Sequence, residues 1–393
     1  MEIRLKAGAG FPNRLLYTLT VIAGVSVANL YYNQPLLDMI RQEMGTTTLA
    51  ANHIALFSQC GYALGLLFLI PLADLRSRRR ILLVDFTLLI LALLATATAP
   101  DIGVLHVSSL VIGVCSVVPQ FFIPFAAQYS RPENKNRNVG IILSGLLTGI
   151  LASRVVSGAV GEWLGWREMY YIATGMMLVC AVLVFRILPD EKPNFTGSYA
   201  ALMRSLFTLL KQYPLLRLHS VRAALAFGSF MGFWATLAFK MAQEPFHAGS
   251  DVVGMLGLCG IAGAVTASFI GKYIARLGVY RFNCFGALLQ LAAWGLFAAG
   301  GDHYGPIIGG ILLGRHRHAV HPAEQPGTAV RALPVSRQPD QHDLHELLLH
   351  RRFARHAALG HGLGAPRLVG RRGNRSPAHR PVAHHHARRQ TVG

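Results

Sequence analysis

Three charged side chains interrupt long apolar stretches of this sequence, and they are the first candidates for chemistry. Arg154 lies 16 residues after Asn138 in one such stretch, a distance of roughly 24 Å in a helix that rises about 1.5 Å per residue. A guanidinium so far inside could hold an anionic group or a carboxylate, or it could pair structurally between helices. Asp85 and Arg222 each lie about one turn inside a stretch. Arg222 is interpreted as structural, because a long side chain near an end reaches back to water. Asp85 is a candidate coupling residue, with a structural role as an equally good interpretation.

Other reactive groups do not form catalytic or metal-binding patterns. The 5 cysteines lie singly in apolar segments, never at the spacing of a disulfide framework or a metal site. The sequence contains neither an HExxH zinc motif nor a GxSxG nucleophile motif. We therefore expect no catalytic residues, no metal and no cofactor, and we do not interpret the chain as an enzyme.

The composition excludes an ordinary soluble protein. Hydrophobic residues make up 52% of the 393 residues and charged residues only 14%, against about 25% charged in soluble proteins. A helix that crosses the hydrocarbon core needs roughly 20 mostly apolar residues. Nine segments meet that requirement: 15–37, 50–72, 81–98, 104–128, 138–160, 168–188, 217–239, 252–274 and 281–300. A tenth apolar run begins at Tyr304 and stops at Gly314, too short to cross. The sequence thus predicts an all-α membrane protein with nine full spans and a partial tenth.

The charges of the connecting segments predict the orientation of these spans. The N-terminal segment and the connectors after the second, fourth, sixth and eighth spans are net positive, whereas four of the other five carry −1 and residues 161–167 are neutral. Since an excess of Lys and Arg marks the cytoplasmic side, we expect a multi-pass protein with a cytoplasmic N-terminus. Residues 198–212 place leucines on one helical face, with Arg204 and Lys211 opposite. This pattern indicates an interfacial amphipathic helix.

A repeated loop indicates a two-part organisation. Residues 71–80 follow the second span and end in three arginines, and the weaker copy at 271–281 follows the eighth. A six-helix unit used twice explains this spacing. The expected parts are an N-terminal six-helix half at 1–188, a cytoplasmic linker with the interfacial helix at 189–216, an incomplete C-terminal half at 217–314 and a tail at 315–393.

These motifs resemble those of the major facilitator superfamily. The loop from Asp74 to Arg80, its second copy and the six-plus-six layout carry the resemblance. Residues 29–37 and the run Gly165, Trp166, Arg167 are similar to a bacterial subgroup of inner-membrane efflux carriers, including an uncharacterised enteric one. The sequence departs from the antiporter pattern, because residues 104–128 contain no arginine and Ile150 replaces a proline.

The resemblance implies a central cavity between the halves, lined in part by the first and fourth spans. As substrate contacts it implies five polar residues: Asn29, Asn33, Gln34, Gln120 and Arg154. The alternative for the amides is hydrogen bonding between helices. As a gate at the cytoplasmic loop it implies four charged residues: Asp74, Arg78, Arg79 and Arg80. The alternative for these is a purely topological role.

Small residues recur at every fourth position in the fifth span, from Gly145 to Gly161, and in the eighth, from Gly263 to Gly271. Such stripes let helix backbones approach closely within lipid. The resemblance implies that the two stripes meet across the halves. It also implies that Gly61 and Gly65 meet an eleventh helix, for which this sequence has no segment.

The tail differs in composition from everything before it. Residues 315–393 hold 14 Arg against 4 acidic residues, for +10 of the total +19, and contain no Ile, Met, Tyr, Trp, Cys or Lys. The run His384, His385, His386 has no partner set for a metal, and the tail lacks the interleaved aromatic residues of a nucleic-acid surface. A composition that switches inside a span is typical of a shifted reading frame, so we expect a non-native, disordered tail of a pseudogene-like product.

These observations predict a secondary active transporter that moves a small solute across the bacterial inner membrane by alternating access. With the resemblance, they favour proton-coupled efflux by a monomer, with the bilayer and protons as partners and no nucleic acid. We expect little activity from the truncated form. The alternative is a non-transporting membrane remnant that binds or regulates.

Overall fold

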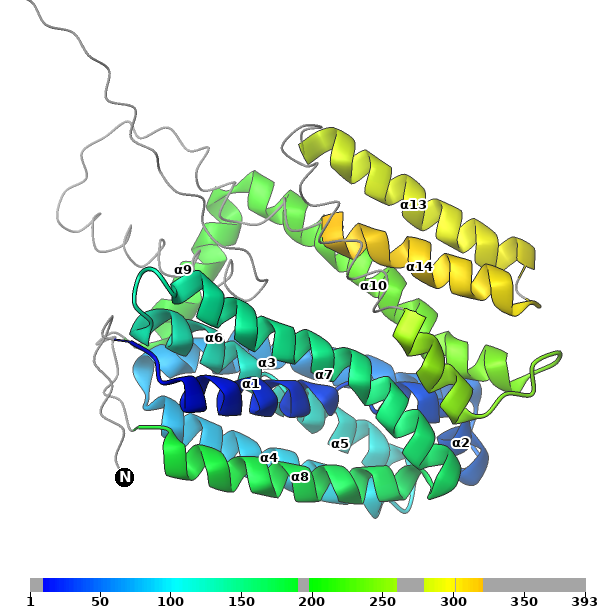
Figure 1. Cartoon of the computed structure of the whole chain (residues 1–393), viewed down its shortest axis with the longest axis horizontal. Helices are drawn as coiled ribbons and strands as arrows, with labels where there is room; N and C mark the ends of the chain where they lie inside the picture. The colour runs from blue at the N-terminus through cyan, green and yellow to red at the C-terminus, as the bar shows by residue number, and fades with distance from the viewer. Residues whose placement is uncertain (1–9, 190–197, 260–278, 301, 321–393) are drawn as a thin grey trace, which may run out of the picture. The chain divides into compact units, whose positions relative to one another are not determined.

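The computed structural model describes residues 10–189, 198–259, 279–300 and 302–320, and every regular element in these ranges is a helix. Figure 1 shows their arrangement. In residues 10–189 the helices are α1 (Asn13–Ala28), α2 (Asn33–Glu43), α3 (Thr48–Leu75), α4 (Arg78–Ala97), α5 (Ile102–Cys115), α6 (Val118–Tyr129), α7 (Lys135–Trp163) and α8 (Trp166–Ile187). They are followed by α9 (Tyr199–Gln212), α10 (Pro214–Ala242), the short helix Ser250–Cys259, α13 (Val279–Gly300) and α14 (Tyr304–Val320).

Seven spans within the described ranges are long and apolar enough to cross a membrane, from Asn13–Glu43 to Pro214–Ala242. They correspond to the first seven spans expected from the sequence, so the all-α membrane architecture is confirmed. The expected eighth span begins with Ser250–Cys259 and continues into residues 260–278, which lie outside the described residues. The expected ninth corresponds to α13. The partial tenth begins at Tyr304 as expected, but α14 continues past Gly314 to Val320.

The first and fourth spans are each broken into two helices, which the apolar pattern does not predict. Residues 29–32 form a turn between α1 and α2, and a shorter turn separates α5 from α6. Pro35 lies in the first turn of α2. Proline is tolerated there because the first N–H groups of a helix have no intrahelical acceptor.

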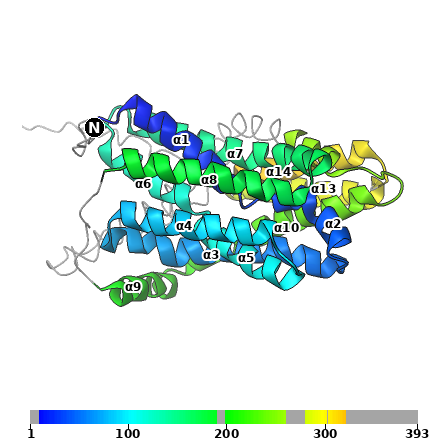
Figure 2. The ribbon, with the colours of Figure 1, turned by 90° about the horizontal axis from the view of Figure 1, so that it is seen from below.

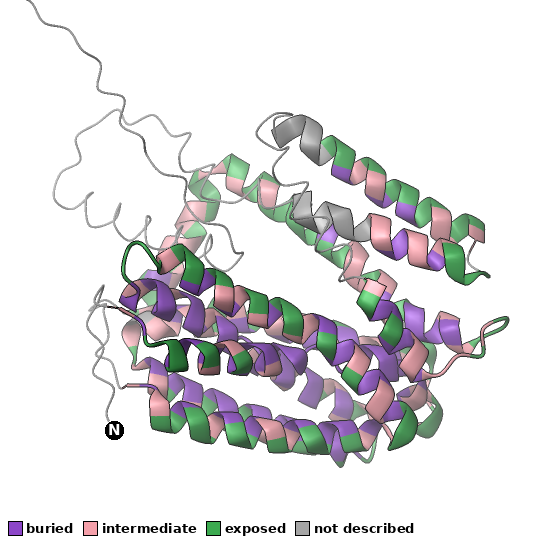
Figure 3. Cartoon of the chain, viewed as in Figure 1, coloured by how far each residue is buried: buried purple, intermediate pink, exposed green. Residues whose placement is uncertain are grey.

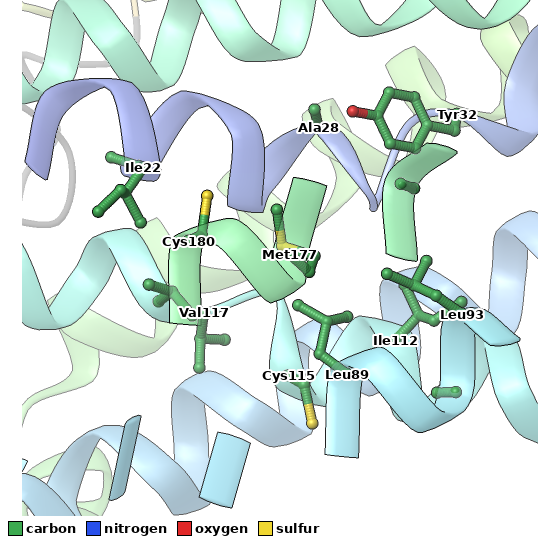
Figure 4. Packing of buried hydrophobic residues seen from close by; sticks show 14 of the residues in the cluster. Ile22, Ala28, Tyr32, Leu89, Leu93, Ile112, Cys115, Val117, Met177 and Cys180 are labelled. Carbon is green, nitrogen blue, oxygen red and sulfur yellow. The ribbon is translucent and has the colours of Figure 1, made fainter. Parts of the chain in front are cut away.

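The core of the N-terminal part is apolar and drawn from several helices. Figure 4 shows Ile22 of α1, Met177 of α8, Leu89 of α4 and Ile112 of α5 packed together. α4 lies along α8, and α3 along α5 (Figures 1 and 2). The outer faces are apolar too: Val84, on α4, is 61% exposed. Figure 3 shows exposed positions alternating with buried ones along the helices. An apolar exterior is what a helix surrounded by lipid requires.

Glycines lie at the closest contacts between helices. The contacts of Gly61 and Gly65 correct the expectation that these two residues meet an eleventh helix. A Cβ atom at Gly61 or Gly65 would collide with the carbonyl groups of Leu110 or Val114. These glycines therefore pack α3 against α5, a pairing inside the N-terminal part, and not against an eleventh helix.

The glycine stripe of α7 divides between two partners. Gly145 and Gly149 meet Thr20 and Gly24 of α1, whereas at the end of the stripe a Cβ at Gly161 would be 3.2 Å from Oγ of Ser250. Gly158, next to the stripe, approaches the backbone of Ser250. The expected contact with the eighth span is therefore confirmed only for the C-terminal part of α7. The expected partners Gly263, Ala267 and Gly271 lie outside the described residues.

The amphipathic helix expected at 198–212 is α9. Ser198 caps it by accepting a hydrogen bond from the N–H of Ala201 at 3.2 Å, and Leu202 is buried at 2% exposed. The hydroxyl of Tyr199 donates to the carbonyl of Phe68 at 3.0 Å, which ties α9 to α3. α10 begins at Pro214, within the range expected for the linker. The tail from residue 321 onward lies outside the described residues.

Candidate functional site

Arg154, in α7, is the most deeply buried cation in the described part of the chain. It is 0% exposed, although a lone charge within a membrane span is costly. Its Nε donates to Oε1 of Gln34, in α2, at 2.8 Å, and its Nη1 donates to the carbonyl of Ile150 at 2.9 Å. These hydrogen bonds replace part of the water that the guanidinium loses on burial.

Two aromatic rings flank the same guanidinium. Its Cζ lies 4.9 Å from the ring centre of Tyr31, in the turn between α1 and α2, and 4.5 Å from that of Trp234, in α10. Cation–π contacts of this kind are worth about 0.5–2 kcal/mol each. Gly257 of the short helix lies over the side chain, because a Cβ there would be 3.3 Å from Cβ of Arg154. Segments from both sides of the linker thus enclose Arg154.

The structure brings Gln34 into direct contact with Arg154. Gln120 lies further away and is linked to the surroundings of Arg154 through Tyr62. Gln120 Nε2 donates to the hydroxyl of Tyr62 at 3.2 Å. Tyr62 packs on the apolar cluster that contains Tyr31, so the chain of contacts runs from α6 to Arg154. The sequence singles out Gln34, Gln120 and Arg154. It does not single out Trp234, because nothing in the local sequence distinguishes it from a core tryptophan.

Asn29 and Asn33 point to other helices. Asn29 Nδ2 donates to the sulfur of Met177, in α8, at 3.2 Å. Asn33 Nδ2 donates to Oγ of Ser58, in α3, at 3.0 Å. Both residues make the interhelical bonds that were the alternative to substrate contact. Their Oδ1 atoms are buried without a hydrogen-bond partner among the described residues.

Asp85 lies in α4 and is 3% exposed. Neither carboxyl oxygen has a well-aligned hydrogen-bond partner in the described part of the chain. The thiol of Cys115, in α5, lies beside it. A carboxyl group in such surroundings has little to stabilise its charged form.

The arginines of the loop hold the start of α4 against neighbouring helices. Arg78 is buried, and its Nη2 donates to Oε1 of Gln128 at 3.2 Å. Arg79 donates to the carbonyl of Phe185, at the end of α8, at 2.8 Å. Arg80 is exposed. The side chain of Asp74 lies outside the described residues.

Two carboxylates that join distant segments were not singled out from the sequence: Glu43, at the end of α2, and Glu162, near the end of α7. Glu43 accepts from Nε1 of Trp166 at 2.6 Å and from Nε of Arg167 at 2.8 Å. The motif at 165–167 indicates that Trp166 and Arg167 make a specific contact. It does not identify Glu43 as the partner, because Glu43 lies more than a hundred residues away in the sequence.

The second carboxylate joins α7 to the short helix. Glu162 Oε2 accepts from the N–H of Ser250 at 3.1 Å, and Ser250 Oγ donates to the carbonyl of Gly158 at 2.8 Å. Glu162 therefore caps the short helix Ser250–Cys259 from outside.

Residues 19–315 match the family described as Major Facilitator Superfamily. The chain belongs to the major facilitator superfamily. Relatives support membrane transport as its class of function. The chain is 35% identical over 300 residues to "Uncharacterized transporter YgaY" of Escherichia coli O157:H7, covering 76% of each chain. It is 26% identical to "Inner membrane transport protein YnfM" of Escherichia coli (strain K12), covering 68% of this chain and 66% of that protein.

Solved structures share the superfamily fold. The crystal structure of nucleoside transporter NupG aligns with a TM-score of 0.64 and 13% identity, covering 88% of this chain and 87% of that one. In the part of this superfamily chain that the structure describes, no group of three or more His, Cys, Asp and Glu side chains could hold a metal ion.

Proposed function

We propose that this chain is built as a secondary active transporter that moves a small solute across the bacterial inner membrane by alternating access. The observation that carries the proposal is the enclosure of Arg154 by Gln34 and Tyr31 on one side of the linker and by Trp234 on the other. A site shared in this way can be taken apart when the two halves rock, and can be rebuilt around a solute.

The solute class that fits this site is a small organic anion. A guanidinium binds carboxylates and phosphates through two parallel hydrogen bonds, and the flanking rings of Tyr31 and Trp234 suit an apolar body. In the enclosed state Gln34 takes the position of the anion as the acceptor for Arg154. An incoming solute would exchange with this amide.

Asp85 is the proposed proton-binding residue of an efflux cycle. It is buried and lacks a well-aligned hydrogen-bond partner among the described residues, so its charged form is costly at membrane depth. Proton uptake and release at this carboxyl, out of phase with solute binding, would couple the two fluxes. The proposed orientation has a cytoplasmic N-terminus, and the proposed functional unit is a monomer.

The composition of residues 315–393 and the end of the family match at residue 315 favour a second candidate. In it, the present chain is a membrane protein that binds but does not cycle, because a shifted reading frame has replaced its last helices. A chimera in which the C-terminal helices of the YgaY relative replace residues 315–393 separates the two candidates.

Everted vesicles provide the test, with a dye that reports the pH gradient and a panel of small carboxylates as solutes. We expect at least one solute to dissipate the gradient in vesicles with the chimera, and little effect with the present chain. Asp85→Asn in the chimera should abolish the response, while the exposed Asp302→Asn control should not. A chimera that is folded but silent to the whole panel would favour the binding protein, and an undiminished D85N response would exclude Asp85 as the proton site.

A further inference from the structure

A cavity of about 400 Å³ opens where α1 and α7 begin, apart from the Arg154 site. The polar residues of its lining are Asn13, Arg131, Asn134, Arg137 and Asn138. Small-molecule sites in proteins measure about 300–1,000 Å³, so the cavity has room for a phosphate and the group that carries it.

The charge of the lining is positive. Among the residues that the structure describes, the lining holds two guanidinium groups, of Arg131 and Arg137, and no carboxylate. The acid of the same connector, Glu133, is exposed and does not line the cavity. A guanidinium matches the geometry of a phosphate and binds it through paired hydrogen bonds.

The N-terminal ends of α1 and α7 add to the positive charge of the cavity lining. Neither α1 nor α7 has a side-chain cap on its first turn, and neither carries an acid there. Within the described residues, no side chain accepts from the first N–H groups of either helix, and the partial positive charge of these groups favours an anion.

The wall of the cavity is held in place by packing. The N–H of Gly10 donates to the carbonyl of Tyr129 at 3.2 Å, and Phe11 meets the ring of Phe125 edge-on at 5.7 Å. Asn138 is 6% exposed, and its Nδ2 donates to Ser130 Oγ at 2.8 Å. These contacts hold the backbone near both arginines in place.

We propose that this cavity binds the phosphate group of an anionic lipid headgroup. In the orientation expected from the connector charges it lies at the cytoplasmic leaflet, where anionic lipids attract basic groups. The site lies outside the proposed solute pathway, so the inference does not depend on the transport proposal.

Native mass spectrometry of the full chain in neutral detergent tests the proposal, with phosphatidylglycerol and phosphatidylcholine as probes. We expect the wild type to retain phosphatidylglycerol in preference to phosphatidylcholine. The variant Arg131→Gln/Arg137→Gln should retain at least tenfold less phosphatidylglycerol. The matched variant Arg186→Gln/Arg217→Gln removes the same charge at two exposed positions outside the cavity and should retain as much as the wild type.

Inorganic phosphate, added as a competitor, separates the two sources of the ligand. Displacement of phosphatidylglycerol by phosphate would support the headgroup phosphate as the recognised group. Binding of inorganic phosphate that depends on Arg131 and Arg137, without lipid retention, would overturn the lipid assignment in favour of a soluble phosphate. Equal lipid retention by all three proteins, each with an unchanged melting profile, would overturn the site itself.

Discussion

Arg154 shows how a full charge is tolerated inside an apolar bundle. Its guanidinium is completely buried, yet two acceptors and two rings surround it. The loss of hydration is offset only while these partners stay in place. The residue therefore couples the packing of α7 to the positions of α2 and α10.

Replacing Arg154 by alanine should destabilise the protein. The change leaves Gln34 Oε1 without its donor and opens a space between the rings of Tyr31 and Trp234. We expect a loss of about 2–4 kcal/mol in the free energy of unfolding, seen as a lower melting temperature of the purified chain in detergent. The exposed Arg186→Ala should change it by less than about 0.5 kcal/mol. Equal melting of the two variants would show that the enclosure of Arg154 carries no stability.

At this scale the sequence predicts which residues matter better than it predicts their partners. The depth of Arg154 in an apolar stretch was enough to single it out. Its pairing with Gln34 depends on the break at residues 29–32, which turns α2 relative to α1, and no periodicity in the sequence marks that break. Asn29 and Asn33 lie at this break and bond to different helices, α8 and α3.

The helices of this chain pack through positions where a side chain is absent. Gly24 and Gly149 let α1 and α7 approach until backbone meets backbone. The stripe was visible in the sequence, but a stripe identifies only the face and not its partner. For this reason Gly61 and Gly65 were assigned to the wrong neighbour.

Gly149→Ala should lower stability, because its Cβ would collide with the backbone of Gly24. Overpacking of this kind costs about 1–3 kcal/mol. Gly140, in the same helix, has open space around it, because a Cβ there would meet nothing within 4 Å. Gly140→Ala should therefore be neutral or stabilising by up to about 1 kcal/mol. Thermal melts of the two variants check the contrast, and a harmless Gly149→Ala would contradict the close approach of α1 and α7.

Glu162 supports an element on the other side of the linker. It supplies an acceptor to the N–H of Ser250 that the short helix lacks in its own sequence. We expect Glu162→Ala to speed hydrogen exchange in residues 250–259 and to cost about 1 kcal/mol. The exposed Glu133→Ala serves as the control, and unchanged exchange at 250–259 would rule out the cap.

For the whole molecule, the fold class and the number of early spans can be predicted from hydropathy, and the expected orientation from charge. Length, apolar composition and repeated loop indicate the class and the family, because a lipid environment leaves few alternatives to packed helices. The breaks in the first and fourth spans and the continuation of α14 to Val320 were not predictable, because they depend on local turn geometry and tertiary contacts.

The orientation of the whole molecule can be tested directly. Alkaline phosphatase fused after Arg80 should be inactive, and the same enzyme fused after Asp101 should be active, because the basic loop is expected in the cytoplasm and the acidic one outside. Activity assays on intact cells provide the measurement. Equal activity at the two positions would refute the expected topology and, with it, the placement of the arginine-lined cavity at the cytoplasmic leaflet.

The divided contacts of α7 have a consequence for how this fold can change over time. One part of the helix is pressed against α1 and another against Ser250, in both places without room for a methyl group. α7 therefore cannot slide or rotate without losing its contacts with both α1 and Ser250. Random mutagenesis followed by selection for a folded protein should therefore find α7 nearly intolerant of substitution along its glycine edge, and should accumulate neutral changes on the outward faces of α4 and α8.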